Sequence, residues 1–204
     1  MKRSEPHFSV KSYAIIILAA GDSSRMGRPK QLLEYGGKSL LQRAIDSAGE
    51  CRPDHLIVVL GSSFQQIKNE INTPGISIIE NSNWESGIAS SIIAGLNSLE
   101  DSTTGTDAAI IMTCDQPFAD AKILKALITE QAGSGKLIVG SRYARTQGIP
   151  ALFHRTIFPD LLSLKGDSGA KMLFEKYKDQ ASFVSFQNGG IDIDTSDDYK
   201  KLTK

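Results

Sequence analysis

A short segment near the N-terminus concentrates positive charge among small residues. Residues 21 to 30 read GDSSRMGRPK, which sets Arg25, Arg28 and Lys30 against the single acid Asp22. Backbone N–H groups of a small-residue turn bind phosphate oxygens, a guanidinium contacts them in pairs, and an ammonium adds a point charge. The segment therefore predicts a polyphosphate site, and a basic loop without a specific ligand is the alternative.

Two common glycine fingerprints for nucleotides do not fit this segment. The GxGxxG pattern requires a glycine two positions after Gly21, where the chain has Ser23, and GxxxxGK[ST] requires a glycine at the position of Met26. The mismatch disfavours a nicotinamide-dependent dehydrogenase. The glycines and cations of residues 21–30 therefore follow neither of these two patterns.

An aspartate follows a buried apolar run in the middle of the chain. Asp115 comes shortly after the run 108–112, which reads AAIIM, and in open α/β sheets ligands bind beyond the carboxyl ends of the strands. Mg²⁺ sites of this kind use one or two carboxylates together with substrate oxygens and water. Asp115 is therefore a candidate metal ligand, and capping of an expected helix at 119–131 is its alternative role.

A second group of carboxylates lies near the C-terminus. Asp192 and Asp194 are two positions apart, so in an extended segment both face the same side. Asp197 and Asp198 fall in the first turn of an expected closing helix, where the helix dipole favours negative charge. The first two are the candidates for metal binding, and their spacing does not choose between them.

The sequence has no GxSxG motif and no cysteine–histidine pattern of a nucleophile. Its histidines, His7, His55 and His154, show no metal-ligand spacing, and neither Cys51 nor Cys114 has a helical histidine neighbour. If the attacking group of a transfer reaction is a phosphate monoester, it is already ionised near neutral pH, because its second pKa is about 6. Such a reaction requires positioning of the two reactants and neutralisation of their charge rather than a base.

Composition bounds the class of protein. The chain has 204 residues with 23 basic and 23 acidic side chains, so its net charge does not favour nucleic acid or an anionic membrane as a partner. The longest apolar run, 14–20, is far shorter than the roughly 20 residues of a membrane span. Two unrelated cysteines make no disulfide framework. We expect one cytoplasmic domain over residues 1–204, with 1–12 as a flexible extension.

The elements that must position these residues alternate in type. Continuous apolar runs predict strands buried on both faces, at 13–19, 56–60, 76–79, 108–112 and 137–139. Segments with apolar residues at helical spacing lie between them, around 40–48, 92–99 and 123–128. This order predicts an α/β fold with a doubly wound, mostly parallel sheet and helices on both faces.

The pattern loosens after residue 140. Residues 141–153 are expected to form an arginine-bearing loop that leads into a short strand, and 161–177 to form two helices around a glycine turn. In that turn, Asp167 or Ser168 is a candidate N-cap for the second helix. A strand at 182–186 then leads to the closing helix, for which Thr195 or Ser196 is the expected N-cap.

The charged turn also carries a recognisable signature. LAAGDSSRMGRPK resembles the pattern LAAGxSxRMGxxK of the MobA-like nucleotidyltransferases, and the similarity extends through NWESGIASSI, MTCDQPF, GIPALF, LKGDSGAK and DIDTSDDY. The most similar branch contains molybdenum cofactor cytidylyltransferase. The resemblance implies a Rossmann variant of the nucleotide-diphospho-sugar transferase type.

The resemblance implies roles for single residues. Asp115 and Asp194 correspond to the metal ligands, with Asp192 as a neighbour, and Arg25, Lys30 and Asp115 correspond to the catalytic residues. The residues implied to bind the nucleotide are Leu18, Ala19, Ala20, Gly21, Arg25, Lys30, Asn83, Gly87, Ser90 and Asp115.

The implied reaction is the transfer of CMP from CTP to the phosphate of molybdenum-bound molybdopterin, with Mg²⁺ or Mn²⁺ and release of pyrophosphate. Gly148, Pro150 and Asp167 correspond to the acceptor side, although the tripeptide 148–150 reads GIP where cytidylyltransferase relatives carry Gly-His-Pro. The product would pass to an apo-molybdenum hydroxylase or its chaperone. The alternatives are GTP as donor, a sugar or alcohol phosphate as acceptor, or a delivery module that binds nucleotide or cofactor without turnover.

Overall fold

The computed structural model describes residues 8–23, 26–71, 73–100, 105–144 and 146–203. Its centre is a sheet of seven strands in the order β5-β4-β1-β6-β8-β7-β9. The strands are β1 (Tyr13–Ala19), β4 (His55–Leu60), β5 (Ser77–Glu80), β6 (Ala108–Thr113), β7 (Ile138–Tyr143), β8 (Thr146–His154) and β9 (Ala181–Ser185). A separate two-stranded sheet pairs β2 (Glu34–Tyr35) with β3 (Lys38–Ser39).

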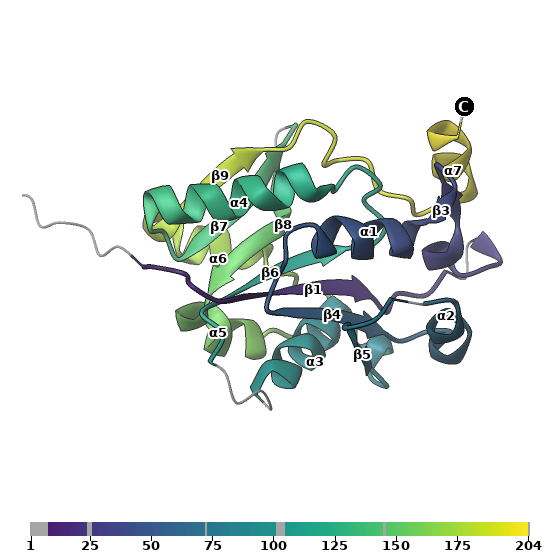
Figure 1. Cartoon of the computed structure of the whole chain (residues 1–204), viewed down its shortest axis with the longest axis horizontal. Helices are drawn as coiled ribbons and strands as arrows, with labels where there is room; N and C mark the ends of the chain where they lie inside the picture. Colours follow the sequence, from purple (N-terminus) through teal and green to yellow (C-terminus); the bar gives the residue numbers. More distant parts are fainter. Residues whose placement is uncertain (1–7, 24–25, 72, 101–104, 145, 204) are drawn as a thin grey trace, which may run out of the picture.

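Helices cover both faces of the large sheet (Figure 1). They are α1 (Leu40–Gly49), α2 (Phe64–Glu70), α3 (Ile88–Glu100), α4 (Ala121–Ser134), α5 (Phe158–Leu162), α6 (Lys171–Lys176) and α7 (Ser196–Leu202). Short 3-10 turns occur at Lys30–Leu32, Trp84–Ser86, Arg155–Ile157 and Lys178–Gln180. No helix in the described part of the chain is long and apolar enough to cross a membrane.

The continuous apolar strands are explained by two cores, one on each side of the sheet. Ile15 and Ile17 of β1 pack with α1 and α4, whereas Ile16 and Leu18 pack with α3, α5 and α6. Successive residues of a strand point to opposite faces, so a strand that is covered on both sides has no solvent-facing positions. The four strands β5, β4, β1 and β6 pair in parallel. The predicted mostly parallel α/β fold is confirmed.

The strand expected at the end of residues 141–153 is present, but the loop expected before it is wrong. Residues 141–143 end β7 and residues 146–153 form most of β8, which is antiparallel to both of its neighbours, β6 and β7. The register between β7 and β8 shifts between Val139 and Ser141, opposite the stretch that contains Pro150. A proline is tolerated in a strand at such an irregularity because it has no N–H to donate. Gly148 and Pro150 therefore belong to an internal strand.

The helix starts resolve the capping alternatives. Asp120 is the N-cap of α4 and accepts hydrogen bonds from the N–H groups of Lys122 and Ile123, so Asp115 does not have this role. Helix α6 begins after Ala170 without a side-chain cap, so neither residue proposed for that cap has it. Thr195 caps α7, in a reciprocal arrangement with Asp198, as predicted.

Candidate active site

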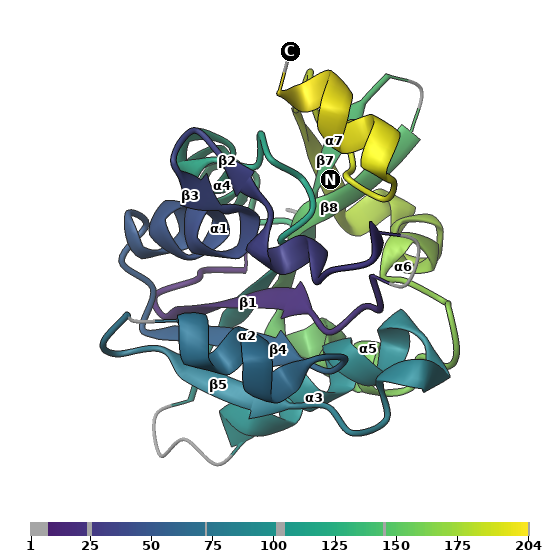
Figure 2. The same ribbon diagram turned by 90° about the vertical axis from the view of Figure 1, so that its right-hand side faces the viewer.

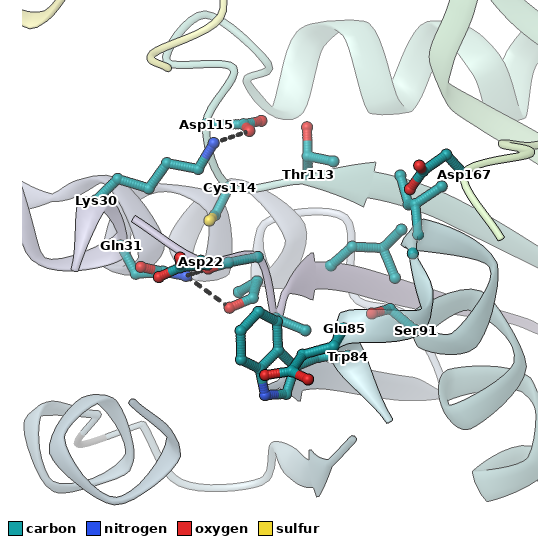
Figure 3. Close-up of a pocket in the computed structure, with 16 residues that line it drawn as sticks. Asp22, Lys30, Gln31, Trp84, Glu85, Ser91, Thr113, Cys114, Asp115 and Asp167 are labelled. Atoms are coloured by element: carbon teal, nitrogen blue, oxygen red, sulfur yellow. Dashed lines mark hydrogen bonds and ion pairs between the residues drawn. The ribbon is translucent and has the colours of Figure 1, made fainter. Parts of the chain in front are cut away.

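A cavity of about 320 Å³ opens at the carboxyl ends of β1 and β6. Figure 3 shows Lys30 and Asp115 on one side of it, Asp167 across from them, and Trp84 and Glu85 along another wall. The turn after β1, the end of β6 and the start of α3 all contribute. The complete lining is Leu18, Ala19, Ala20, Gly21, Asp22, Lys30, Gln31, Trp84, Glu85, Gly87, Ile88, Ser91, Thr113, Cys114, Asp115 and Asp167.

A buried glutamine organises the turn after β1. The side chain of Gln31 is almost fully buried and donates from Nε2 to the carbonyl oxygens of Ala19, at 2.8 Å, and Gly21, at 3.1 Å. The Lys30 N–H donates to Ser23 Oγ at 2.8 Å. These bonds satisfy polar groups that would otherwise be buried without partners, and they fix the turn from which Lys30 extends.

Lys30 joins the two carboxylates that the sequence assigns to the metal. Its Nζ lies 2.7 Å from Asp115 Oδ2 and 2.8 Å from Asp194 Oδ1. Burial alone would lower the pKa of Lys30, but the ion pairs with Asp115 and Asp194 raise it well above its usual value. The ammonium is therefore charged, and two carboxylates converge on one cationic centre.

Asp192 stands beside this group. Burial, followed by the negative charges of Asp115 and Asp194, raises the pKa of Asp192 to about 6. Among the described residues, no group of three His, Cys, Asp or Glu side chains is arranged to hold a metal ion. Two converging carboxylates nevertheless fit a hard divalent cation, which takes its remaining ligands from phosphate oxygens and water.

The start of α3 and the 166–169 loop meet closely at the cavity. Gly87 has a φ of +97°, and a Cβ there would collide with the backbone of Gly166. The Ala89 N–H donates to the Gly166 carbonyl oxygen at 3.1 Å. This contact brings Asp167 into the lining of the cavity. Only glycine allows both the backbone conformation and the close approach.

A second cavity, of about 210 Å³, adjoins the first and shares Leu18 and Ile88 with it. Most of its wall is apolar, with the Tyr143 side chain and the backbone of Gly148 among the lining groups. Lys171 also lines it and donates from Nζ to Thr146 Oγ1 at 2.9 Å.

The structure gathers most of the residues assigned to the site. Eight line the first cavity, namely Leu18, Ala19, Ala20, Gly21, Lys30, Gly87, Asp115 and Asp167, and Gly148 lines the second. Arg25 lies outside the described residues. Arg28 is placed away from the cavity, with its Cζ 5.8 Å from the centre of the Tyr199 ring.

Three assigned residues, which are Ser90, Asn83 and Pro150, do not line either cavity. Ser90 Oγ accepts a hydrogen bond from Asn81 Nδ2 at 2.8 Å and donates to the Gly87 carbonyl oxygen, also at 2.8 Å. Asn83 is exposed and precedes the Trp84–Ser86 turn. Pro150 is buried, and its carbonyl oxygen accepts from Ser141 Oγ at 2.6 Å.

Several lining residues carry no sequence signal of their own. Ser91, Thr113 and Gln31 line the cavity although their types alone do not mark them as ligand contacts. Position after a strand or at a helix start is the only signal that could have found them. Burial, followed by the charge of Asp115, raises the pKa of the Cys114 thiol to about 12, which agrees with the absence of a nucleophile role for it.

Comparisons with known proteins agree with this geometry. Residues 15–181 match the family model described as the MobA-like NTP transferase domain. The chain is 27% identical to nicotine blue oxidoreductase of Paenarthrobacter nicotinovorans over 199 residues, covering 92% of this chain and 94% of that protein. It is 29% identical to purine catabolism protein PucB of Bacillus subtilis over 200 residues, covering 93% and 95%.

A solved structure of similar fold contains a metal. Rv0371c from Mycobacterium tuberculosis in complex with manganese superposes with a TM-score of 0.78 and 27% identity, covering 94% of this chain and 98% of that chain. The similarity extends over nearly the whole length of both chains.

Proposed function

Because the chain belongs to the MobA-like NTP transferase family, we propose that it transfers CMP from CTP to the phosphate of molybdenum-bound molybdopterin. Nucleotidyl transfer follows from the family, whereas the base and the acceptor are the proposed part. The observation that carries the proposal is the convergence of Asp115 and Asp194 on Lys30 at the edge of a cavity bounded by the small-residue turn.

The residues of the cavity have different proposed roles, according to their charge. In our proposal, the backbone at Gly21 and the ammonium of Lys30 bind the triphosphate, and Asp115 and Asp194 hold Mg²⁺ or Mn²⁺. A protein of similar fold, Rv0371c, has been solved in complex with manganese, which supports the choice of a divalent metal. The bound ion would offset negative charge on the triphosphate and on the leaving pyrophosphate. Arg25 remains a proposed phosphate ligand from the signature.

The transfer itself needs no general base from the protein. An oxygen of the acceptor phosphate, ionised near neutral pH, forms a bond to the α-phosphorus of CTP. The bond from that phosphorus to the bridging oxygen of the β-phosphate breaks, and the electron pair leaves with pyrophosphate. The chain contributes by aligning the two phosphates and by balancing their charge.

The adjoining cavity supports an acceptor with a ring system. Its mostly apolar wall favours burial of a flat, weakly hydrated group, and the carboxylate of Asp167 lines the first cavity close to the boundary between the two. Gly148 and Asp167 are therefore kept as proposed acceptor-side residues. We place Pro150 behind them, as support for the β8 backbone.

The test is pyrophosphate release from each of the four common NTPs with Mg²⁺ or Mn²⁺ and molybdopterin, compared with a panel of sugar and alcohol phosphates. Release that occurs only with CTP as the donor and molybdopterin as the acceptor supports the proposal. Release with GTP, or with another acceptor, replaces the substrates and keeps the reaction. Tight CTP binding without release for any acceptor would support the delivery module instead.

A second assay addresses a different reaction class. One relative of similar length carries the name of an oxidoreductase, so oxidation of NADH and NADPH with the same acceptors should be followed in parallel. We expect none, because the turn after β1 lacks the GxGxxG spacing that dinucleotide sites of the Rossmann type use.

A further inference from the structure

The two sides of the candidate metal site come from opposite ends of the chain. Lys30 and Asp194 are separated by 164 positions, and half of the Asp194 side chain is exposed. An exposed ion pair of this kind contributes little to holding two segments together. Some other contact must therefore fix the position of Asp194 relative to the turn after β1. Ile193, the buried neighbour of Asp194, donates its backbone N–H to the carbonyl oxygen of Asp115 at 3.0 Å.

Helix α7, which begins two positions after Asp194, supplies a further contact with the turn. Tyr199 donates from its hydroxyl to the carbonyl oxygen of Glu34 at 2.7 Å, and its ring faces the guanidinium of Arg28 at 5.8 Å. Both partners flank Lys30 in sequence. Figure 2, which faces the carboxyl end of β1, shows α7 at the C-terminal end of the chain, at the rim of the molecule. Tyr199 thus connects the turn that carries Lys30 to the helix that follows Asp194.

The apolar contacts of α7 form a small cluster apart from the two sheet cores. Its buried members are Leu33, Leu40 and Ile193, with Tyr199 and Leu202 of α7 packed against them. None of the residues of α7 itself is buried. A short helix with so little buried surface opens at lower free-energy cost than the sheet cores do. We therefore expect α7 to open without unfolding of the sheet cores.

We propose that Tyr199 is a positioning residue for the metal–nucleotide site. By fixing α7 against the segment around Arg28 and Glu34, it acts together with the Ile193–Asp115 hydrogen bond to hold Asp194 opposite Asp115, so that docking of α7 and binding of the divalent ion are linked. Linkage requires the reverse effect as well, so metal and nucleotide bound at the site must stabilise the docked helix. The inference rests on the proposed function for the metal role of Asp115 and Asp194 and for the identity of the nucleotide.

The test uses Mn²⁺ as the probe, alone and with CTP, on the full chain. In Tyr199→Phe the ring is kept and one hydrogen bond is lost, and we expect Mn²⁺ affinity, measured by electron paramagnetic resonance, to fall about 2- to 10-fold. Tyr199→Ala also loses the ring contacts, so its Mn²⁺ affinity should fall further. In the unmodified protein, Mn²⁺ with CTP should slow amide hydrogen exchange in α7, and this protection should be smaller in both variants.

Tyr177→Phe is the matched control, because Tyr177 donates its hydroxyl to Asp160 at 2.5 Å, outside both cavities. It should bind Mn²⁺ as the unmodified protein does. Unchanged Mn²⁺ affinity in both Tyr199 variants, a lower thermal midpoint without any change in affinity, or α7 exchange that ignores Mn²⁺ would each overturn the inference. None of these measurements requires turnover, so they can be interpreted even if the pyrophosphate assay shows no release.

Discussion

Lys30 Nζ lies 2.7 Å from Asp115 Oδ2, although 85 positions separate the two residues in the chain. The sheet accounts for this contact. Strands β1 and β6 are parallel neighbours, with Leu18 opposite Thr113, so the segments that leave them start at the same edge. The first of these segments carries the cation and the second carries the carboxylate, at the edge where open α/β sheets bind ligands.

Replacing Asp115 by asparagine should remove turnover without unfolding the protein. The side chain lies at a strand end and is not part of either sheet core, and the change keeps its shape. Loss of a preorganised charge that faces the reacting phosphates lowers kcat by at least about 100-fold. The measurements are pyrophosphate release and circular dichroism.

The matched control for this substitution is Asp160→Asn, which removes another Asp–Lys ion pair, with Lys176 at 2.6 Å, away from the cavity. It should retain activity. Near-normal turnover in Asp115→Asn would remove Asp115 from the proposed metal ligands.

Replacing Lys30 by alanine should change two affinities in opposite directions. Without the ammonium, Asp115 and Asp194 are left as neighbouring carboxylates with no shared cation, which favours a divalent ion. Mn²⁺ should therefore bind more tightly when nucleotide is absent. CTP should bind about 10-fold or more weakly when metal is absent, with a smaller loss for CMP, because a phosphate-binding charge is gone.

Isothermal titration of Lys30→Ala with Mn²⁺, CTP and CMP checks both effects, with Lys176→Ala as the control that loses a lysine paired outside the cavity. Equal losses for CTP and CMP would argue against a triphosphate role for Lys30. Weaker Mn²⁺ binding would show that the two carboxylates do not act together.

Sequence reasoning predicted the candidate site through residues that follow strands. Lys30 and Asp115 could be predicted because a charged turn and an acid directly after two buried apolar runs are informative wherever the sheet is parallel. Their direct contact, and the role of Gln31, could not be predicted. A glutamine buried in a turn looks like any polar surface residue until the carbonyl oxygens that it binds are known.

The error in the 141–153 segment has a similar cause. Thr146, Gly148 and Pro150 have the composition of a loop, and the strand that they form is stabilised by pairing with β6 and β7 rather than by local preference. Docking of α7 could not be predicted from the sequence either. The closing helix and its Thr195 cap are local features, whereas the hydrogen bond from Tyr199 to Glu34 joins residues 165 positions apart.

Gly148→Ala should impair the acceptor more than the nucleotide. A Cβ at this position would collide with the Tyr143 hydroxyl, which lines the second cavity, and overpacking of this kind costs about 1–3 kcal/mol. We expect the KM for the acceptor to rise about 10-fold and the KM for CTP to change less than about 2-fold.

Gly133→Ala is the control for that experiment. Gly133 lies within α4 with open space where a Cβ would be placed, so alanine there should leave both KM values unchanged and stabilise the helix by up to about 1 kcal/mol. A Gly148→Ala enzyme with an unchanged KM for the acceptor would remove the second cavity from the acceptor side.

Asp107 should make the stability of the protein depend on pH. Hydrogen bonds from the backbone N–H groups of Lys11, at 2.9 Å, and Ser12, at 3.2 Å, lower the pKa of Asp107 below its usual value. A carboxyl whose pKa is lower in the folded state stabilises the protein above the pKa of the unfolded state, and this contribution is lost as the pH falls through the folded-state pKa. Asp107→Asn should therefore have a lower free energy of unfolding at pH 7, by about 0.5–1 kcal/mol, a small value because the site is partly exposed.

Urea unfolding of both proteins at pH 7, 5 and 3 checks this prediction, with pH values chosen around the ordinary carboxyl pKa of roughly 4. The difference in unfolding free energy should shrink towards the acid end, and a difference that stays constant or grows there would show that charge on Asp107 does not stabilise the fold.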